Sequence, residues 1–425
     1  MAKIKSIHAE EILDSRGVPT IETTVQLADG VVAKSSVPSG QSKGSYEAME
    51  LRDANPSRFS GMGVLKAVEN VNSVIGPKLV GIDVFQQQKI DRTMIEIDGT
   101  ANKSRLGANA TLSVSQAVAK GGATSSLLPL FIYLREFIPF FTNPGTKETP
   151  RSIKFPTPLF NMMEGGAHAR SSIDIQECLI VPASSKSYQE SLELGASLYQ
   201  TLKSLLIEGG FSTLVADEGG FAPNIKSNRK ALELLKQTER SGFRFSTDFF
   251  LGIDAAANTL FKNNMYKFSE KEGVLSTEEL ADYYISLFSE FSLIYIEDPF
   301  SEEDWNGWKR ISTELSSKTL IVGDDLVTTN PYRLQLALNN NVINGVIIKP
   351  NQIGTVTETI AVCEMARLKN LKIIVSHRAG ETPDDFIADF AVAIGADYAK
   401  FGAPARERVI KYNRLLTIEK EIQRL

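Results

Sequence analysis

The 425-residue sequence predicts an α/β protein in which a small α+β domain precedes a closed barrel of strands and helices. Three observations support this fold class. A strand pattern followed by helical periodicity fills the first third of the chain, a segment without either periodicity follows, and short apolar runs then alternate with helix-length segments. The chain is longer than one average domain, and it leaves room for a barrel of roughly 250 residues.

The first third of the chain has the signals of a sheet followed by helices. Residues 21–37 alternate at period two around an Asp-Gly turn, which predicts a β-hairpin. Helical periodicity then occurs in residues 63–79, 86–97 and 108–123. We therefore expect an α+β domain over residues 1–140.

A composition change marks the expected domain boundary. The stretch FTNPGTKETPRSIKFPTP is rich in Pro, Gly, Thr and charged residues, and it breaks both periodicities. We assign residues 141–157 to a linker and residues 158–425 to the barrel domain.

Six short apolar runs in the second domain each end in an ionisable residue. After a longer first interval of roughly 43 residues, the run ends are about 23 to 28 residues apart, which is the length of one βα repeat. Such repeats predict a parallel, closed barrel whose chemistry lies at the carboxyl ends of the strands. The terminal residues are Asp254, Glu297, Asp324, Lys349, His377 and Lys400.

Three of these run ends are successive carboxylates, Asp254, Glu297 and Asp324. Barrel closure would bring them together, and carboxylates packed this closely repel one another. A hard divalent cation removes the repulsion, and Mg²⁺ suits a few carboxylates together with water and substrate. The alternative is that each acid pairs with a nearby Lys or Arg at the barrel rim.

The other three run ends, Lys349, His377 and Lys400, are expected across the barrel mouth from the acids. A lysine held near a divalent cation and a second ammonium has a lowered pKa, which suits a general base, and Lys349 is the candidate. Pro350 favours extended backbone at Lys349, as expected at a strand end. The alternative for a single strand-end lysine, Lys400 above all, is an ion pair with a neighbouring acid.

Two glycine-containing stretches, residues 164–177 and 216–224, add further candidates. Glycine doublets let a backbone approach a ligand closely and let a loop move. His168, Glu177 and Glu218 are therefore candidates for substrate contact and proton delivery. A single histidine near a turn is usually a surface residue, but the chain has only three histidines.

Composition excludes several other classes of protein. With 46 basic and 51 acidic residues the net charge is −5, and no Lys/Arg-rich block indicates nucleic-acid binding. No apolar run approaches the ~18 residues of a membrane span, and the N-terminus lacks a secretory pattern, so we expect a cytoplasmic protein. Cys178 and Cys363 are far apart in apolar surroundings and are expected to be buried thiols.

Long ordered motifs resemble the enolase family from the first expected strand to the C-terminus. They include EILDSRGVPT, VPSGQSKG, DEGGFAPN, YIEDPFSEEDWNGW, VGDDL, IKPNQIGT and SHRAGET. The resemblance implies an N-terminal α+β domain, a (β/α)8 barrel that begins ββαα, and a homodimer or higher homo-oligomer. It also implies the glycolytic interconversion of 2-phosphoglycerate and phosphoenolpyruvate. The irregular start of such a barrel would account for the long first interval between run ends.

The resemblance also implies metal and substrate ligands. Asp254, Glu297 and Asp324 would hold a first Mg²⁺, and Ser42 would help to bind a second Mg²⁺ that arrives with the phosphorylated substrate. A small anionic substrate carrying a phosphate or phosphonate is the implied partner.

The resemblance further implies a division of catalytic roles. Lys349 would remove the proton from C2, and Glu218, with Glu177 beside it, would protonate the leaving hydroxide. Lys400 would contact the substrate carboxylate and Arg378 the phosphate. The pocket would also be lined by His168 and His377.

The family pattern is not kept everywhere. Ala379 replaces a serine of the SHRSGET motif, and Lys43 replaces a threonine of the mobile loop, both at the phosphate end of the site. Other departures are Glu164 for asparagine, Arg170 for an acid, Asn258 for glutamate and Val18 for asparagine.

These departures leave three functional hypotheses. The first is ordinary enolase, and the second is a paralogue that dehydrates an analogue with a modified phosphate end, such as a carboxyphosphono group. The third is a non-catalytic binding or scaffold protein, which would have no reason to keep every charged strand end.

Overall fold

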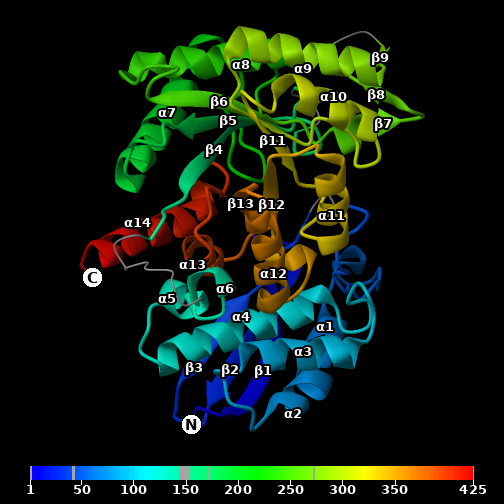
Figure 1. The fold of residues 1–425 in the computed structure, drawn as a ribbon, viewed down its shortest axis with the longest axis vertical. Coiled ribbons are helices and arrows are strands. Elements are labelled where there is room, and N and C mark those ends of the chain that lie inside the picture. Colours follow the sequence, from blue (N-terminus) through cyan, green and yellow to red (C-terminus); the bar gives the residue numbers. More distant parts are fainter. Residues whose placement is uncertain (1, 41–43, 143–152, 170–172, 271–272, 425) are drawn as a thin grey trace.

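The computed structural model describes residues 2–40, 44–142, 153–169, 173–270 and 273–424. Ser42, Lys43 and Arg170 lie outside the described residues. The molecule is elongated, with the N-terminal part at one end and the barrel with its surrounding helices at the other (Figure 1).

The N-terminal part is a three-stranded antiparallel sheet covered by helices. Strands β1 (Ile4–Leu13), β2 (Pro19–Leu27) and β3 (Val32–Ser36) pair in chain order. β2 and β3 are the hairpin that the alternating pattern predicted. The helical segments are α1 (Leu65–Glu69), a π-helical stretch (Asn70–Ile75), α2 (Gly76–Leu79), α3 (Gln87–Asp98) and α4 (Ala108–Ser125).

Helix α4 is buried on almost every side. Its small residues, mainly Ala, Ser and Gly, allow close approach of β2 and β3 on one side and of barrel segments on the other. Figure 1 shows α4 between the N-terminal sheet and the barrel helices. The predicted helical periodicity of this segment is confirmed, although it reflects burial more than an amphipathic face.

Eight strands close into a barrel in the order β10-β11-β12-β13-β14-β4-β5-β6. Strand β5 is antiparallel to both of its neighbours, and the remaining pairs are parallel. The strands are β4 (Thr157–Glu164), β5 (Glu177–Pro182), β6 (Phe249–Asp254), β10 (Tyr295–Glu297), β11 (Leu320–Gly323), β12 (Gly345–Ile348), β13 (Lys372–Ser376) and β14 (Tyr398–Lys400).

The barrel begins ββαα, as the family resemblance implied. Helices α7 (Tyr188–Glu208) and α8 (Asn228–Gln237) follow β4 and β5 before β6 begins. Regular alternation of strand and helix comes after β6. The later helices are α9 (Thr277–Phe291), α10 (Trp305–Leu315), α11 (Pro331–Asn340), α12 (Val356–Leu368), α13 (Phe386–Ala393) and α14 (Val409–Arg424).

The long interval between Asp254 and Glu297 has a different cause from the expected one. We attributed it to the irregular start of the barrel, and this was wrong, because the ββαα unit precedes Asp254. A small antiparallel sheet of β7 (Phe261–Lys262), β8 (Met265–Lys267) and β9 (Val274–Leu275) is inserted between β6 and α9. Such short strands give little alternation, so sequence periodicity did not reveal them.

Several helices around the barrel are capped by their own sequence. Ser187 and Glu190 form a capping box at α7, and Ser276 and Glu279 form one at α9. The reciprocal hydrogen bonds satisfy amide groups that a helix start leaves without partners.

The buried apolar residues form two large clusters, and the chain passes from the first to the second near residue 119. One contains the N-terminal sheet and helices, and the other joins the outer face of the barrel to its helices. Phe131 and Leu134 of α5 (Leu130–Arg135) belong to the barrel cluster, and α6 (Pro139–Thr142) follows. Cys178 and Cys363 are buried and free, as predicted. Among the described residues, no helix is both long enough and apolar enough to cross a membrane.

Candidate active site

The predicted run ends meet at one mouth of the barrel. Asp254, Glu297 and Lys400 end strands β6, β10 and β14, and the register pairs Glu297 with Asp254. Asp324, Lys349 and His377 come directly after strands β11, β12 and β13. The polar cavity at this mouth is lined by His168, Glu177, Glu218, Asp254, Asp324, Lys349, His377, Arg378, Ala379 and Lys400 among others.

Lys400 lies at the centre of an acidic group. Its Nζ is 2.9 Å from one carboxylate oxygen each of Glu177, Asp254 and Glu297, and all four side chains are buried. Burial opposes the charged form of Lys400, but the three carboxylates raise its pKa well above the ordinary value. Burial, together with the charge of Asp254, raises the pKa of Glu297 to about 8. The site therefore has more negative charge than its lysines balance.

The donor set fits a divalent cation, and one atom supports this directly. Glu297 Oε1 is buried without a hydrogen-bond partner among the described residues, although such atoms are almost always satisfied. The carboxylates of Asp254, Glu297 and Asp324 offer oxygen ligands of the kind that Mg²⁺ prefers. Lys400 Nζ bridges Asp254 and Glu297, and Lys349 Nζ binds Asp324, so cation binding would relieve both lysines of this role.

A second acidic group adjoins this set. Oxygen atoms of Asp298, Asp324 and Asp325 lie within 4.8 Å of one another. Asp298 has a positive φ of 42° and accepts the backbone N–H groups of Asp324 and Asp325 at 2.9 and 2.6 Å. Burial and the neighbouring acids raise the pKa of Asp325 to about 8. Sequence reasoning missed Asp298 and Asp325, although the acidic doublets ED and DD at two strand ends could have indicated them.

Lys349 is half-buried at the end of β12 and forms an ion pair with Asp324. Its backbone is extended, with φ −129° and ψ 105°, as Pro350 predicted. We expected a lowered pKa, on the assumption of a nearby cation. Burial acts in that direction, but Asp324 outweighs it and raises the pKa of Lys349 in the metal-free site. The expected direction therefore depends on a cation that neutralises Asp324.

Glu218 is held by the two site histidines. His377 Nε2 lies 3.2 Å from Glu218 Oε2, and Asn161 donates to the same oxygen at 3.2 Å. Burial opposes ionisation, but His377 and His168 lower the pKa of Glu218 well below its ordinary value. Glu218 is thus a carboxylate in the free site, and it must gain a proton before it can protonate a leaving group.

Arg408 sets the tautomer of His377. Arg408 is fully buried, and its guanidinium lies 3.1 Å from His377 Nδ1. Arginine only donates, so Nδ1 must be the acceptor and Nε2 must carry the ring proton, facing Glu218. Burial lowers the pKa of His377 to about 4, which keeps the ring neutral. Arg408 also donates to the carbonyl oxygens of Arg378 and Ala379 at 2.7 and 2.6 Å.

A residue from the N-terminal part completes the site. Glu47 accepts from both terminal nitrogens of Arg378, at 3.0 and 3.3 Å. Glu47 also accepts from the Gly44 N–H at 3.1 Å and from Gln352 Nε2 at 3.3 Å. Sequence reasoning missed this contact, because nothing in the local pattern relates residue 47 to residue 378. It ties residues 44–47 to the barrel.

Fold and site together define a TIM-barrel protein with an N-terminal α+β part and an acidic barrel mouth whose carboxylates suit a divalent cation. Family models match both parts of the chain, "Enolase, N-terminal domain" over residues 4–134 and "Enolase, C-terminal TIM barrel domain" over residues 152–424. The enolase of Ehrlichia ruminantium (strain Gardel) is 45% identical over 420 residues, which cover 98% of this chain and 96% of that protein. The chain belongs to the enolase family.

Membership of the family confirms the predicted resemblance and makes the chain a carbon–oxygen lyase of the phosphopyruvate hydratase type. It implies a divalent metal and a small phosphorylated substrate. The hypotheses of a carboxyphosphono substrate and of a non-catalytic scaffold gain no support from these comparisons.

Proposed function

We propose a division of roles among the site residues for the reaction of this lyase, the removal of water from 2-phosphoglycerate to give phosphoenolpyruvate. The observation that carries the proposal is the arrangement at the barrel mouth. Carboxylates that end or follow β6, β10 and β11 form ion pairs with the lysines that follow β12 and end β14, and His377 lines the same cavity. An anionic substrate with an acidic C–H bond and a hydroxyl leaving group needs both kinds of group.

Asp254, Glu297 and Asp324 would hold the first Mg²⁺, and Ser42 would help to hold a second one that arrives with substrate. When bound, the metal supplies positive charge that stabilises the extra negative charge of an enolate. The partnerless oxygen of Glu297 supports the first site.

Lys349 removes the proton from C2 of the substrate. It comes directly after β12, next to Asp324, and only its neutral form can accept a proton. Lys400 would contact the substrate carboxylate, and its buried ammonium would stabilise the charge that accumulates there.

Glu218 and Glu177 act on the leaving hydroxyl group. They lie in the same cavity, and His377 faces Glu218 with a neutral ring whose Nε2 carries a proton. His168 lines the same side of the cavity. Arg378 would bind the substrate phosphate, with Glu47 holding its guanidinium in place, and Ala379 and Lys43 would lie at the same end.

We further propose a cytoplasmic homodimer or higher homo-oligomer with domains at residues 1–140 and 158–425 and a linker at 141–157. The protein would bind neither nucleic acid nor membranes. The net charge of −5 and the family membership support these proposals.

A direct assay tests the proposed function. Purified protein with Mg²⁺ should convert 2-phosphoglycerate to phosphoenolpyruvate, followed by the absorbance of the enol product, and chelation of the metal should abolish turnover. Carboxyphosphono analogues should be turned over more slowly. No turnover of 2-phosphoglycerate together with turnover of an analogue would contradict the proposal.

A further inference from the structure

Glu164 is a charged strand end that the catalytic scheme above does not use. It is the last residue of β4, is fully buried, and pairs in register with Glu177. Because β4 is parallel to β14, its carboxyl end lies at the same mouth as Lys400.

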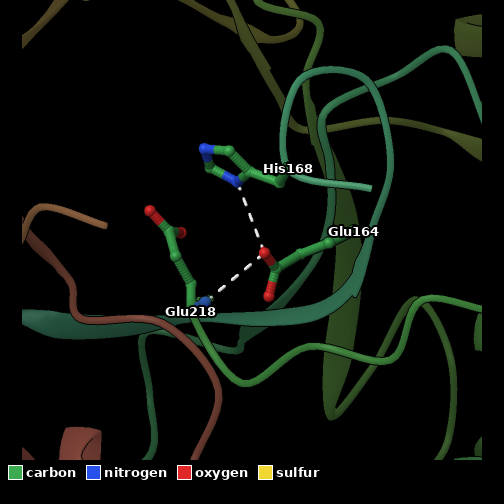
Figure 2. A group of neighbouring side chains, drawn as sticks. All are labelled: Glu164, His168 and Glu218. Carbon is green, nitrogen blue, oxygen red and sulfur yellow. Dashed lines mark hydrogen bonds and ion pairs between the residues drawn. The ribbon is translucent and has the colours of Figure 1, made fainter. Parts of the chain in front are cut away.

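Figure 2 shows one carboxylate oxygen of Glu164 between His168 and the backbone nitrogen of Glu218. Oε1 accepts the Gly220 N–H at 2.6 Å, and Oε2 lies 3.3 Å from His168 Nδ1 and 3.5 Å from the Glu218 N–H. A Cβ at residue 220 would lie 2.9 Å from Oε1, so only glycine allows this approach without a shift. One carboxylate therefore joins the loop of His168 to the turn that carries Glu218.

A carboxylate imposes a proton position that an amide does not. Among the described residues His168 Nδ1 has no hydrogen-bond partner, and the 3.3 Å approach to Glu164 is an ion-pair contact. Burial raises the pKa of Glu164, and His168 opposes this effect. Once ionised, Glu164 only accepts, so the proton between the two groups belongs to Nδ1. The second ring nitrogen of His168 points away from Glu164 in Figure 2, and His168 lines the cavity. An asparagine or glutamine has one carbonyl oxygen and one NH2 group. If the NH2 group faced the Gly220 N–H, two donors would meet. If it faced His168, Nδ1 would have to be the unprotonated acceptor.

The charges around His168 act in the same direction. Glu164 faces it from β4, Glu218 from the turn before Gly219, and Asp254 from β6. Burial opposes the charged ring, but these three carboxylates raise the pKa of His168 above its ordinary value.

We propose that Glu164 is a positioning residue, which orients the His168 ring so that one nitrogen faces Glu164 and the other faces the substrate cavity, and which braces the turn of Glu218. The inference rests on the proposed role of His168 at the substrate. Glu164 also favours the protonated ring, which can donate to an anionic substrate.

The test is the titration of His168 in the metal-free protein, read from ¹H–¹⁵N spectra of histidine-labelled samples. The chain has three histidines, and the exposed His8 on β1 provides an internal reference. Glu164→Gln should lower the His168 midpoint by about one pH unit or more, and Glu164→Asp, which keeps the charge, should restore much of it. Glu164→Asn serves if the glutamine variant fails to fold.

Activity gives a second readout that a purely structural role would not produce. Relative to the parent, kcat/KM of Glu164→Gln should fall about tenfold at alkaline pH and much less at acidic pH, because His168 of the variant loses its proton at a lower pH. Asp389→Asn is the matched control, because it removes a buried carboxylate on α13 that pairs with Arg414 on α14. The control should leave the His168 titration and the pH profile unchanged.

An unchanged His168 midpoint in a folded Glu164→Gln protein overturns the inference. An equal loss of activity at both pH values overturns it as well. The titration needs neither metal nor substrate, so failure of the proposed function would appear separately, as a parent protein that does not convert 2-phosphoglycerate.

Discussion

Single charged residues at the barrel mouth are stabilised mainly by one another. Lys400 is surrounded by three carboxylates, Lys349 binds Asp324, and Arg408 fixes the ring of His377. Local sequence predicted which residue types reach the mouth, because each apolar run ends in an ionisable residue. It could not predict their protonation, since the pKa of Lys349 depends on whether a cation or a bare carboxylate lies beside it.

Asp324→Asn should weaken metal binding, because it replaces a charged ligand with a neutral one that coordinates a hard cation less strongly. Activity should then require a higher Mg²⁺ concentration, by about tenfold or more. Titration of activity against Mg²⁺ measures the effect. Asp389→Asn, on the outer helix α13, is the control. An unchanged Mg²⁺ midpoint in the Asp324 variant would remove this residue from the direct ligands.

His377 should make the fold sensitive to acid. Its pKa is about 4 in the folded protein against an ordinary value of 6.5, so the folded state binds fewer protons than the unfolded chain between these values. The free energy of unfolding therefore falls as the pH drops through this window, by up to roughly 3 kcal/mol from this group. His377→Gln should flatten the decline, as measured by denaturant unfolding between pH 7 and pH 4. An equally steep decline in the variant would refute this assignment.

Ala379 and Lys43 should affect the choice of substrate at the phosphate end. Ala379 lines the cavity without a hydroxyl group, and a missing hydrogen bond to a charged group costs about 1.5–3 kcal/mol. The double variant Ala379→Ser with Lys43→Thr should raise kcat/KM for 2-phosphoglycerate about tenfold, because the added hydroxyl group supplies a hydrogen-bond donor. If the parent already has full efficiency and the variant gains nothing, these two positions do not tune specificity.

At the scale of elements, strand ends were predictable and loop contacts were not. The apolar runs predicted six of the eight barrel strands, because β-strands buried on both faces leave a continuous hydrophobic signal. β4 and β5 were not recognised from repeats, since their antiparallel pairing breaks the βα period. Glu47, Asp298 and Arg408 lie in loops or a short 3-10 turn, where no periodicity relates a residue to its distant partner.

Glu47 should couple the N-terminal loop to the barrel. Glu47→Gln keeps the shape of the side chain but removes the charge that holds Arg378, so the guanidinium should lose its fixed orientation toward the phosphate site. We expect KM for 2-phosphoglycerate to rise about tenfold with a smaller change in kcat. Glu303→Gln, which removes an exposed carboxylate paired with Arg333, is the control. A variant with the parent's KM would show that Glu47 does not position Arg378.

At the scale of the whole molecule, two parts with separate apolar clusters meet at the site. The N-terminal sheet and α4 form one cluster, and the barrel with its helices forms the other. Long ordered motifs across both parts allowed the family to be predicted from sequence alone. The contacts between the parts, such as Glu47 with Arg378 and Ser39 with Gly380, could be identified only from the structure.

We expect Lys349 to remove the C2 proton of 2-phosphoglycerate. Exchange of that proton with deuterated solvent in the presence of Mg²⁺ tests it most directly, because exchange reports proton removal without requiring loss of the hydroxyl group. The parent should exchange the proton, and a folded Lys349→Ala protein that still binds Mg²⁺ should exchange it slower by several orders of magnitude. Exchange at the parent's rate in that variant would contradict the assignment of Lys349 as the base.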